Sequence, residues 1–161
     1  MDQQLLNDII QWDIKNWSKA LKLWEPILKD KKLTKVLALG EREGGLSLYL
    51  ALNNKHVTCT DYNKFEQTPL KLHKKYNVTD KITYSIENAT SLNFEDNLFD
   101  IVVFKSMLGA LRNNSNQEKA FQEAYRVLKP GGYLLFAENL EASSVHRYAR
   151  KKFTKWGEKW H

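Results

Sequence analysis

The stretch VLALGEREGGLSLYLAL, residues 36–52, holds the chain's densest group of glycines, immediately after a short apolar run. Gly40 permits a tight turn and a close backbone approach to a ligand. Gly44 and Gly45 stand where a helix would begin, and the first turn of a helix offers free N–H groups and a positive dipole end to an anion. The spacing therefore predicts a loop that binds the charged part of a cofactor.

Asp61 closes the next apolar run, VTCTD, about 20 residues after the first glycine, the spacing at which an acid can accept hydrogen bonds from ribose hydroxyls. The alternative is an ordinary turn between a strand and a helix, with an aspartate that caps or faces solvent. Because the loop and the acid occur together in a strand, turn and helix context, we favour a cofactor site.

Further polar residues follow the other apolar runs: Asn88 to Thr90, Lys105 with Ser106, and Glu138 with Asn139. In an open parallel sheet, ligands bind beyond the carboxyl ends of the strands. We therefore expect these residues to meet at one crevice.

Five strands must position these residues, and each has its own sequence signal. KVLALG, KHVTCTD, DKITYSIEN, LFDIVVFKS and YLLFAEN are apolar or alternating runs, and the fourth reads as a strand buried on both faces. Helices are expected from GGLSLYLALN, from QTPLKLHKKYN with Thr68 as cap, and from SNQEKAFQEAYRVLKPGG with a capping box from Ser115 to Glu118. Alternating strands and helices predict an α/β fold, a three-layer α-β-α sandwich around a mostly parallel sheet.

The two ends of the chain have separate signals. Between Leu5 and Leu28 apolar residues recur every three or four positions, which predicts one or two amphipathic helices, with Trp12, Trp17 and Trp24 as packing residues. The chain ends in the lysine-rich RYARKKFTKWGEKWH, for which a last helix is expected. We expect a single domain, with residues 1–32 as a helical cap, 33–142 as the cofactor-binding core and 143–161 as a basic helix.

Composition narrows the functional classes. The chain has 161 residues, 42% of them hydrophobic, enough for one core. Its single cysteine, Cys59, cannot form an internal disulfide, and no His/Cys spacing suggests a metal site. There is no signal-peptide pattern and no apolar run long enough to cross a membrane, so a cytoplasmic protein is expected. The net charge of +6 lies mainly in lysine-rich segments that read as a solvated surface, so nucleic-acid binding is not favoured.

Four segments in order resemble the class I S-adenosylmethionine-dependent methyltransferases: VLALGEREGG, VTCTDY, IENATSLNFEDNLFDIVVFKS and VLKPGGYLLFAEN. The resemblance covers about residues 33–142 and implies a Rossmann-like fold with S-adenosylmethionine as cofactor. It places the loop from Gly40 to Gly44, with Glu41 and Arg42, around the methionine part of the cofactor. It also implies that Asp61 holds the ribose, Tyr62 flanks the adenine, and Asn88 and Ala89 meet the adenine edge. Lys105 joins this cofactor-binding set from the fourth strand.

The sequence departs from the family pattern at two positions in the loop. The family commonly has an acid where Ala38 stands and a glycine where Arg42 stands. One hypothesis is that Glu41 faces the cofactor's ammonium group and Arg42 pairs with its carboxylate. The alternative, equally compatible with the sequence, is that both side chains point to solvent.

A third departure concerns the end of the sheet. Family domains usually continue with two further strands, the last of them beside the fifth, and the sequence shows no such strands. The fifth strand is therefore expected to be an apolar edge, which favours a homodimer. The alternatives are that a helix covers this edge or that the chain is part of a longer protein.

The implied reaction is methyl transfer to an oxygen or nitrogen of a small-molecule, sugar or lipid-linked acceptor. Transfer from a sulfonium requires mainly alignment in a dry pocket, so no catalytic residue is assigned, although Lys105, Ser106, Glu138 and His146 are expected near the crevice. The segment FKSMLG lacks the pattern of enzymes that methylate exocyclic amines of nucleic-acid bases. The alternatives are a methyltransferase-like scaffold that binds cofactor poorly and, less favoured, a nucleic-acid methyltransferase.

Overall fold

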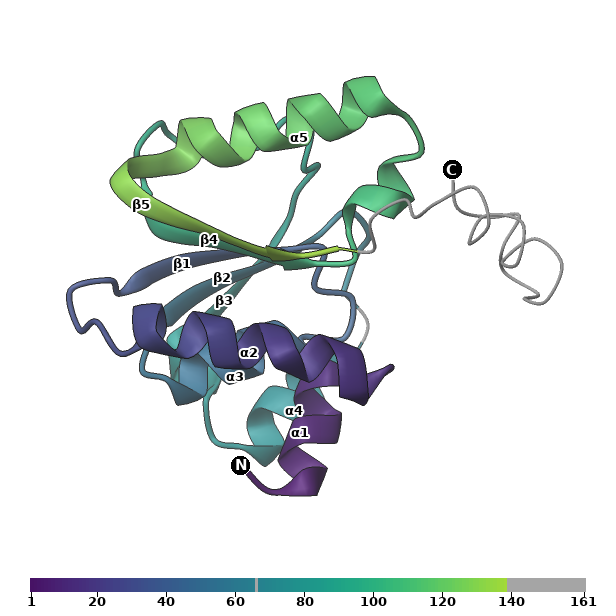
Figure 1. Ribbon diagram of the computed structural model, residues 1–161, viewed down its shortest axis with the longest axis vertical. Helices are drawn as coiled ribbons and strands as arrows, with labels where there is room; N and C mark the ends of the chain where they lie inside the picture. Colours follow the sequence, from purple (N-terminus) through teal and green to yellow (C-terminus); the bar gives the residue numbers. More distant parts are fainter. Residues whose placement is uncertain (66, 139–161) are drawn as a thin grey trace, which may run out of the picture.

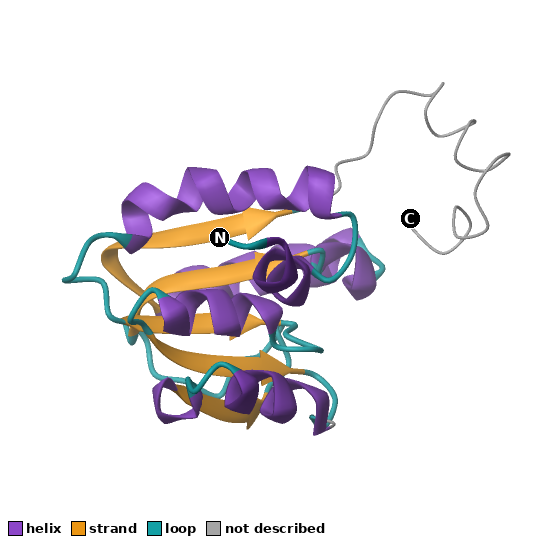
Figure 2. Ribbon diagram, turned by 90° about the horizontal axis from the view of Figure 1, so that it is seen from below, coloured by secondary structure: helices purple, strands orange, loops and turns teal. Residues whose placement is uncertain are grey.

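The computed structural model describes residues 1–65 and 67–138, and its centre is a sheet of five strands in the order β3-β2-β1-β4-β5. All four neighbouring pairs are parallel (Figure 2). The strands are β1 (Lys35–Leu39), β2 (His56–Asp61), β3 (Ile82–Ile86), β4 (Phe99–Lys105) and β5 (Leu128–Ala137). The expected parallel sheet is confirmed, and each strand contains or overlaps the run that predicted it.

Helices cover the two faces of the sheet unequally (Figure 1). One face carries α1 (Gln3–Ile10), α2 (Ile14–Leu28), α3 (Gly45–Leu52) and α4 (Gln67–Lys75), and the other carries α5 (Asn114–Val127). Two short 3-10 turns, η1 (Thr79–Lys81) and η2 (Leu108–Leu111), complete the described chain. The expected three-layer α-β-α arrangement is confirmed, and the N-terminal pattern forms two helices.

Two apolar clusters, one on each side of the sheet, explain why the central strands are apolar throughout. Val36 and Ala38 of β1 face the cluster with α1 to α3, whereas Leu37 and Leu39 face the cluster with α5. A strand buried on both faces needs apolar residues at successive positions. Trp17 and Trp24 are core residues as expected, but Trp12 is 44% exposed.

Both ends of α5 differ from the sequence-based prediction. The cap is Asn113, whose side chain accepts a hydrogen bond from the Asn116 amide at 2.8 Å, so the expected capping box at Ser115 is wrong. An extended asparagine satisfies a free N–H of the first turn as well as serine does. At the other end, Leu128 already belongs to β5 and pairs with Phe99 of β4. The register of the two strands then shifts between Phe99 and Ile101.

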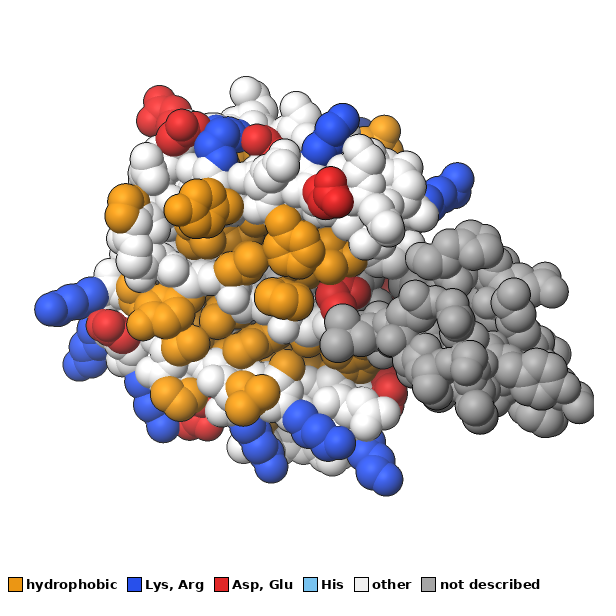
Figure 3. Space-filling model, turned by 45° about the horizontal axis from the view of Figure 1, so that its top comes forward, with side chains coloured by type: hydrophobic (Ala, Val, Ile, Leu, Met, Phe, Trp, Pro, Cys, Tyr) orange, Lys and Arg blue, Asp and Glu red, His pale blue; other side chains and the backbone are white. Residues whose placement is uncertain are grey.

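β5 is an edge of the sheet in the part of the chain that the structure describes. An apolar strip lies over this edge, between α5 and α2 (Figure 3). Leu23, Tyr133 and Phe136 are 75%, 43% and 44% exposed. The expected helix over residues 143–161 and the candidate His146 lie outside the described residues, and the homodimer stays a prediction. No helix within the described ranges is long and apolar enough to cross a membrane.

Candidate cofactor site

A cleft of about 1010 Å³ opens beyond the carboxyl ends of the strands. All nine residues predicted to bind cofactor line it, although they come from four separate segments of the chain. They are Gly40, Glu41, Arg42, Gly44, Asp61, Tyr62, Asn88, Ala89 and Lys105. The structure therefore brings the predicted set together, as the rule for parallel sheets requires.

The glycine loop places its two special backbone conformations at glycines. Gly40 has φ 67° and Gly44 has φ 79°, values that side chains rarely adopt, whereas Arg42 is not among the residues with positive φ. Arginine therefore replaces the family's glycine without backbone strain. A Cβ on Gly40 would also lie 3.2 Å from Cγ of Met107. Glycine at position 40 therefore avoids both an unfavourable backbone conformation and crowding against Met107.

The Glu41 carboxylate is turned inward at the start of α3. Its Oε2 accepts a hydrogen bond from the Ser47 amide at 2.7 Å, and the residue is only 6% exposed. Burial raises the pKa of Glu41, opposed by the Ser47 hydrogen bond and the charge of Lys105. Glu41 also helps to raise the pKa of Cys59, which pairs with Ala38 across β1 and β2. Glu41 thus puts a carboxyl group near the strand position where the family's acid is missing.

Lys105 ends β4 beneath the linker between α1 and α2. Its Nζ donates to the Ile10 carbonyl at 3.3 Å and lies 5.0 Å and 5.4 Å from the ring centroids of Trp12 and Trp17. Burial lowers the pKa of Lys105, while nearby carboxylates, first among them Glu41, act in the opposite direction. A partly desolvated cation and an exposed indole therefore lie side by side at the cleft wall.

Asp61 and Tyr62 form the rim at the end of β2. The Oδ1 atom of Asp61 accepts from the Asn63 amide at 2.9 Å, which fixes the carboxylate's direction. The Tyr62 ring is 71% exposed, so it has the room to lie against a flat ligand.

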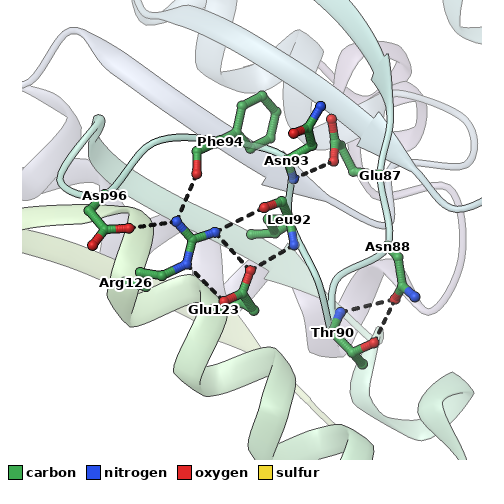
Figure 4. Close-up of polar contacts among 9 residues, drawn as sticks. All are labelled: Glu87, Asn88, Thr90, Leu92, Asn93, Phe94, Asp96, Glu123 and Arg126. Carbon is green, nitrogen blue, oxygen red and sulfur yellow. Dashed lines mark hydrogen bonds and ion pairs between the residues drawn. The ribbon is translucent and has the colours of Figure 1, made fainter.

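The loop 87–98 carries the residues expected at the adenine. The Asn88 Oδ1 atom accepts from the amide and the hydroxyl of Thr90, at 3.0 Å and 2.9 Å (Figure 4). This turn occupies the acceptor atom of Asn88 and leaves the side-chain NH₂ able to donate to a ligand. The arrangement fits asparagine where the family often has aspartate.

Arg126 of α5 holds the middle of this loop (Figure 4). Its guanidinium donates to the carbonyls of Leu92 and Phe94 at 2.9 Å and 2.7 Å, and it pairs with Glu123 and Asp96. Hydrogen bonds to Arg126 lower the pKa of Glu123. A planar guanidinium with five donors suits this set of acceptors, so the loop is organised without a helix of its own.

Other residues line the cleft that sequence reasoning did not assign to it. Gln11 and Trp12 belong to the linker between α1 and α2, and Met107, Arg112 and Asn113 belong to the segment after β4. Trp12 was expected to be packing, and no periodic signal distinguishes it from Trp17. The positive φ of Gln11 and of Arg112 is a tertiary feature with no sequence pattern.

The candidate reactive groups separate into different places. Ser106 lines the cleft as expected, but Glu138 is not among the lining residues. Its carboxylate instead accepts hydrogen bonds from the amides of Met107 and Leu108, at 2.5 Å and 2.9 Å. Glu138 therefore supports the segment after β4. Asn139 lies outside the described residues. Cys59 is fully buried and burial raises its thiol pKa, so it does not fit a nucleophile. No cluster of potential metal ligands occurs in residues 1–65 and 67–138.

Comparison with known proteins identifies the family. The model of a family described as "Methyltransferase domain" matches residues 37–136, from the middle of β1 to the last residue but one of β5. The chain belongs to this methyltransferase domain family. The resemblance drawn from the four sequence segments is thereby confirmed.

A curated relative from Haemophilus ducreyi is named "Ubiquinone/menaquinone biosynthesis C-methyltransferase UbiE". It is 34% identical over 143 residues, which are 83% of this chain and 51% of the relative. The chain thus spans about half the length of this curated relative.

Solved structures of methyltransferases share the fold. A putative methyltransferase from Bacillus halodurans superposes with a TM-score of 0.69 at 22% identity, covering 91% of this chain and 62% of that one. A chain described as a SAM-dependent methyltransferase, from Methanosarcina mazei, is 30% identical with a TM-score of 0.53, covering 62% and 50%. The Rossmann-like methyltransferase fold expected from the sequence is confirmed.

Proposed function

We propose that this chain is an S-adenosylmethionine-dependent methyltransferase domain that methylates a small-molecule acceptor. The observation that supports it most is that all nine predicted cofactor residues line one cleft. Its charges also suit the cofactor: Glu41 and Asp61 are available to the ammonium group and ribose, and Arg42 to the carboxylate.

The cofactor supplies an activated methyl group on its sulfonium when it is bound. In our proposal the loop 40–44 orients the methionine part, Asp61 holds the ribose hydroxyls, and Tyr62, Asn88 and Ala89 surround the adenine. The remaining wall of the cleft, with Trp12 and Lys105, then faces the acceptor. The protein's contribution is alignment of the acceptor and exclusion of water.

For the atom that receives the methyl group, the relatives favour carbon over the oxygen or nitrogen expected from the sequence. The Haemophilus relative is named a C-methyltransferase of ubiquinone/menaquinone biosynthesis. A ring carbon becomes nucleophilic when a neighbouring hydroxyl loses its proton, and a nearby cation stabilises the resulting oxyanion. Trp12 and Lys105 offer a flat apolar surface and a cation side by side, so we propose a hydroxylated aromatic ring as acceptor.

The proposal is tested by supplying S-adenosylmethionine with a naphthohydroquinone that has an unsubstituted ring carbon. We expect S-adenosylhomocysteine to form together with a product that is one methylene group heavier, with the new methyl on carbon by NMR. Methylation on oxygen would contradict a carbon acceptor and support the oxygen or nitrogen acceptor expected from the sequence. Cofactor binding without turnover on quinols or catechols would contradict this acceptor, and no cofactor binding would favour the scaffold alternative.

We also propose that a second copy of the chain covers the edge of β5. The support is a strand edge that no strand of residues 1–65 and 67–138 pairs with, beside the exposed Leu23, Tyr133 and Phe136. Sedimentation velocity should show a dimer that Phe136→Lys weakens and that Tyr125→Lys, a change on exposed α5, leaves intact. A monomer at all concentrations would contradict it.

A further inference from the structure

His73 is a fully buried imidazole that stands between the glycine loop and the sheet. It lies on α4, with Nε2 2.8 Å from the Gly44 carbonyl oxygen and Nδ1 2.5 Å from the Tyr84 hydroxyl of β3. Burying both ring nitrogens is tolerated because each has a partner. His73 therefore links the end of the cofactor loop to β3, although neither His73 nor Tyr84 lines the cleft.

The partners determine which nitrogen carries the proton. A carbonyl oxygen only accepts, so Nε2 must donate to Gly44, and Nδ1 then accepts from the Tyr84 hydroxyl. Burial lowers the pKa of His73, which favours this neutral form. The ring also stacks on Tyr84, with centroids 5.7 Å apart and an interplanar angle of 28°. Tyr84 thus fixes both the tautomer and the orientation of the donor.

The Gly44 carbonyl is held from two directions. It also accepts the Leu48 amide at 2.9 Å in the first turn of α3. Because a peptide group is planar, fixing the Gly44 carbonyl fixes the Gly45 N–H as well, and Gly45 lines the cleft. The fit is close, since a Cβ on Gly44 would lie 2.7 Å from Nε2 of His73.

We propose that His73 is a positioning residue for the cofactor loop, whose hydrogen bond to Gly44 holds the loop in its binding shape while Tyr84 keeps the donating tautomer. The inference rests on the proposed cofactor site. It differs from a purely structural role because it assigns the His73 side chain an effect on cofactor affinity beyond its effect on folding.

The experiment compares variants of the full chain by calorimetric titration with S-adenosylhomocysteine and by urea unfolding. His73→Leu removes both hydrogen bonds, and His73→Gln keeps an amide that can donate to Gly44. Tyr84→Phe removes only the hydroxyl that donates to Nδ1 of His73 and so fixes its tautomer. Tyr49→Phe is the matched control, since its hydroxyl donates to the Leu21 carbonyl at 3.2 Å, a buried hydrogen bond to α2.

We expect His73→Leu to weaken binding about tenfold or more, the effect of roughly one lost hydrogen bond in a preorganised site. His73→Gln should recover most of that affinity, Tyr84→Phe should weaken binding less than His73→Leu, and Tyr49→Phe should bind as the wild type does. Wild-type affinity in His73→Leu, or equal affinities in His73→Gln and His73→Leu, would overturn the inference. If His73→Leu does not fold, wild-type affinity in Tyr84→Phe overturns it instead. A wild-type protein that binds no S-adenosylhomocysteine would overturn the proposed function as well, so the two failures are distinguishable.

Discussion

The loops 40–44 and 87–98 line the same cleft, but contacts of different kinds hold them in place. The first is held by buried groups: neutral His73 on the Gly44 carbonyl and the inward Glu41 carboxylate on the Ser47 amide. The second is held by Arg126 at the surface, in ion pairs with Glu123 and Asp96. The guanidinium side chain is 31% exposed, whereas His73 is fully buried.

The difference indicates how each loop responds to change. Close-packed buried contacts specify one backbone shape, and small additions of volume disturb them. Partly exposed ion pairs tolerate movement and weaken with acid or salt. We therefore expect the methionine side of the site to be rigid and sensitive to sterics, and the adenine side to be adjustable and sensitive to charge.

The largest effect should come from Gly45→Ala. A Cβ there would lie 2.1 Å from the Ile9 carbonyl oxygen, so α1 must move away from α3, at a cost of about 3 kcal/mol for overpacking. Gly131→Ala is the control, since a Cβ at Gly131 meets nothing within 4 Å and only its positive φ opposes alanine, at a cost of about 1 kcal/mol. Urea unfolding measures both, and equal losses would contradict a sterically tight junction at α3.

Arg126→Met should come next, with a loss of about 2 kcal/mol, because the carbonyls of Leu92 and Phe94 lose a charged donor. Lys29→Met removes an exposed pair with Glu25 and should change the free energy of unfolding little. Hydrogen exchange should speed up in the loop 87–98 only for Arg126→Met. An unchanged loop would show that Arg126 does not hold it.

Acid should release the two loops in different pH ranges. The folded-state pKa of His73 lies below 6.5, so its contribution is complete above pH 6.5 and falls as acid protonates the unfolded chain. The pKa of Glu123 lies below 4.5, so its contribution falls only below that pH. The stability difference between wild type and His73→Gln should therefore shrink below pH 6.5, and that for Glu123→Gln only below pH 4.5. Identical pH ranges would contradict the comparison.

The smallest effect on stability should come from Arg42→Ala. Its exposed side chain and ordinary φ predict a change within about 0.5 kcal/mol. If Arg42 pairs with the cofactor carboxylate, the affinity for S-adenosylhomocysteine should nevertheless fall about tenfold. Unchanged affinity in both Arg42→Ala and Glu41→Ala would remove the proposed compensation for Ala38 and the lost glycine.

Much of the fold was predictable because its signals are local. Gly40, Asp61 and Lys105 each end or follow an apolar strand, and parallel strands deliver such residues to one edge of the sheet. The nine predicted residues meet for that reason. Which part of the cofactor each residue contacts is still a prediction.

The rest depends on tertiary contacts that leave no pattern in the sequence. The partners His73 and Gly44 lie 29 residues apart, and Arg126 meets Phe94 across 32. Trp12 reaches the cleft because the linker between α1 and α2 lies against Lys105 at the end of β4. The start of α5 depends on Asn113 being, among several polar residues, the one that caps it. The sequence contains these residues without indicating their partners.

The central claim is that the cleft at the strand ends binds S-adenosylmethionine through Asp61 and the loop 40–44. Calorimetric titration of S-adenosylhomocysteine into the wild type and Asp61→Ala tests it most directly. We predict saturable binding at one site per chain, weakened at least tenfold in Asp61→Ala because a charged acceptor for the ribose hydroxyls is lost. Absence of binding to the wild type, or equal affinity in both proteins, would contradict the claim.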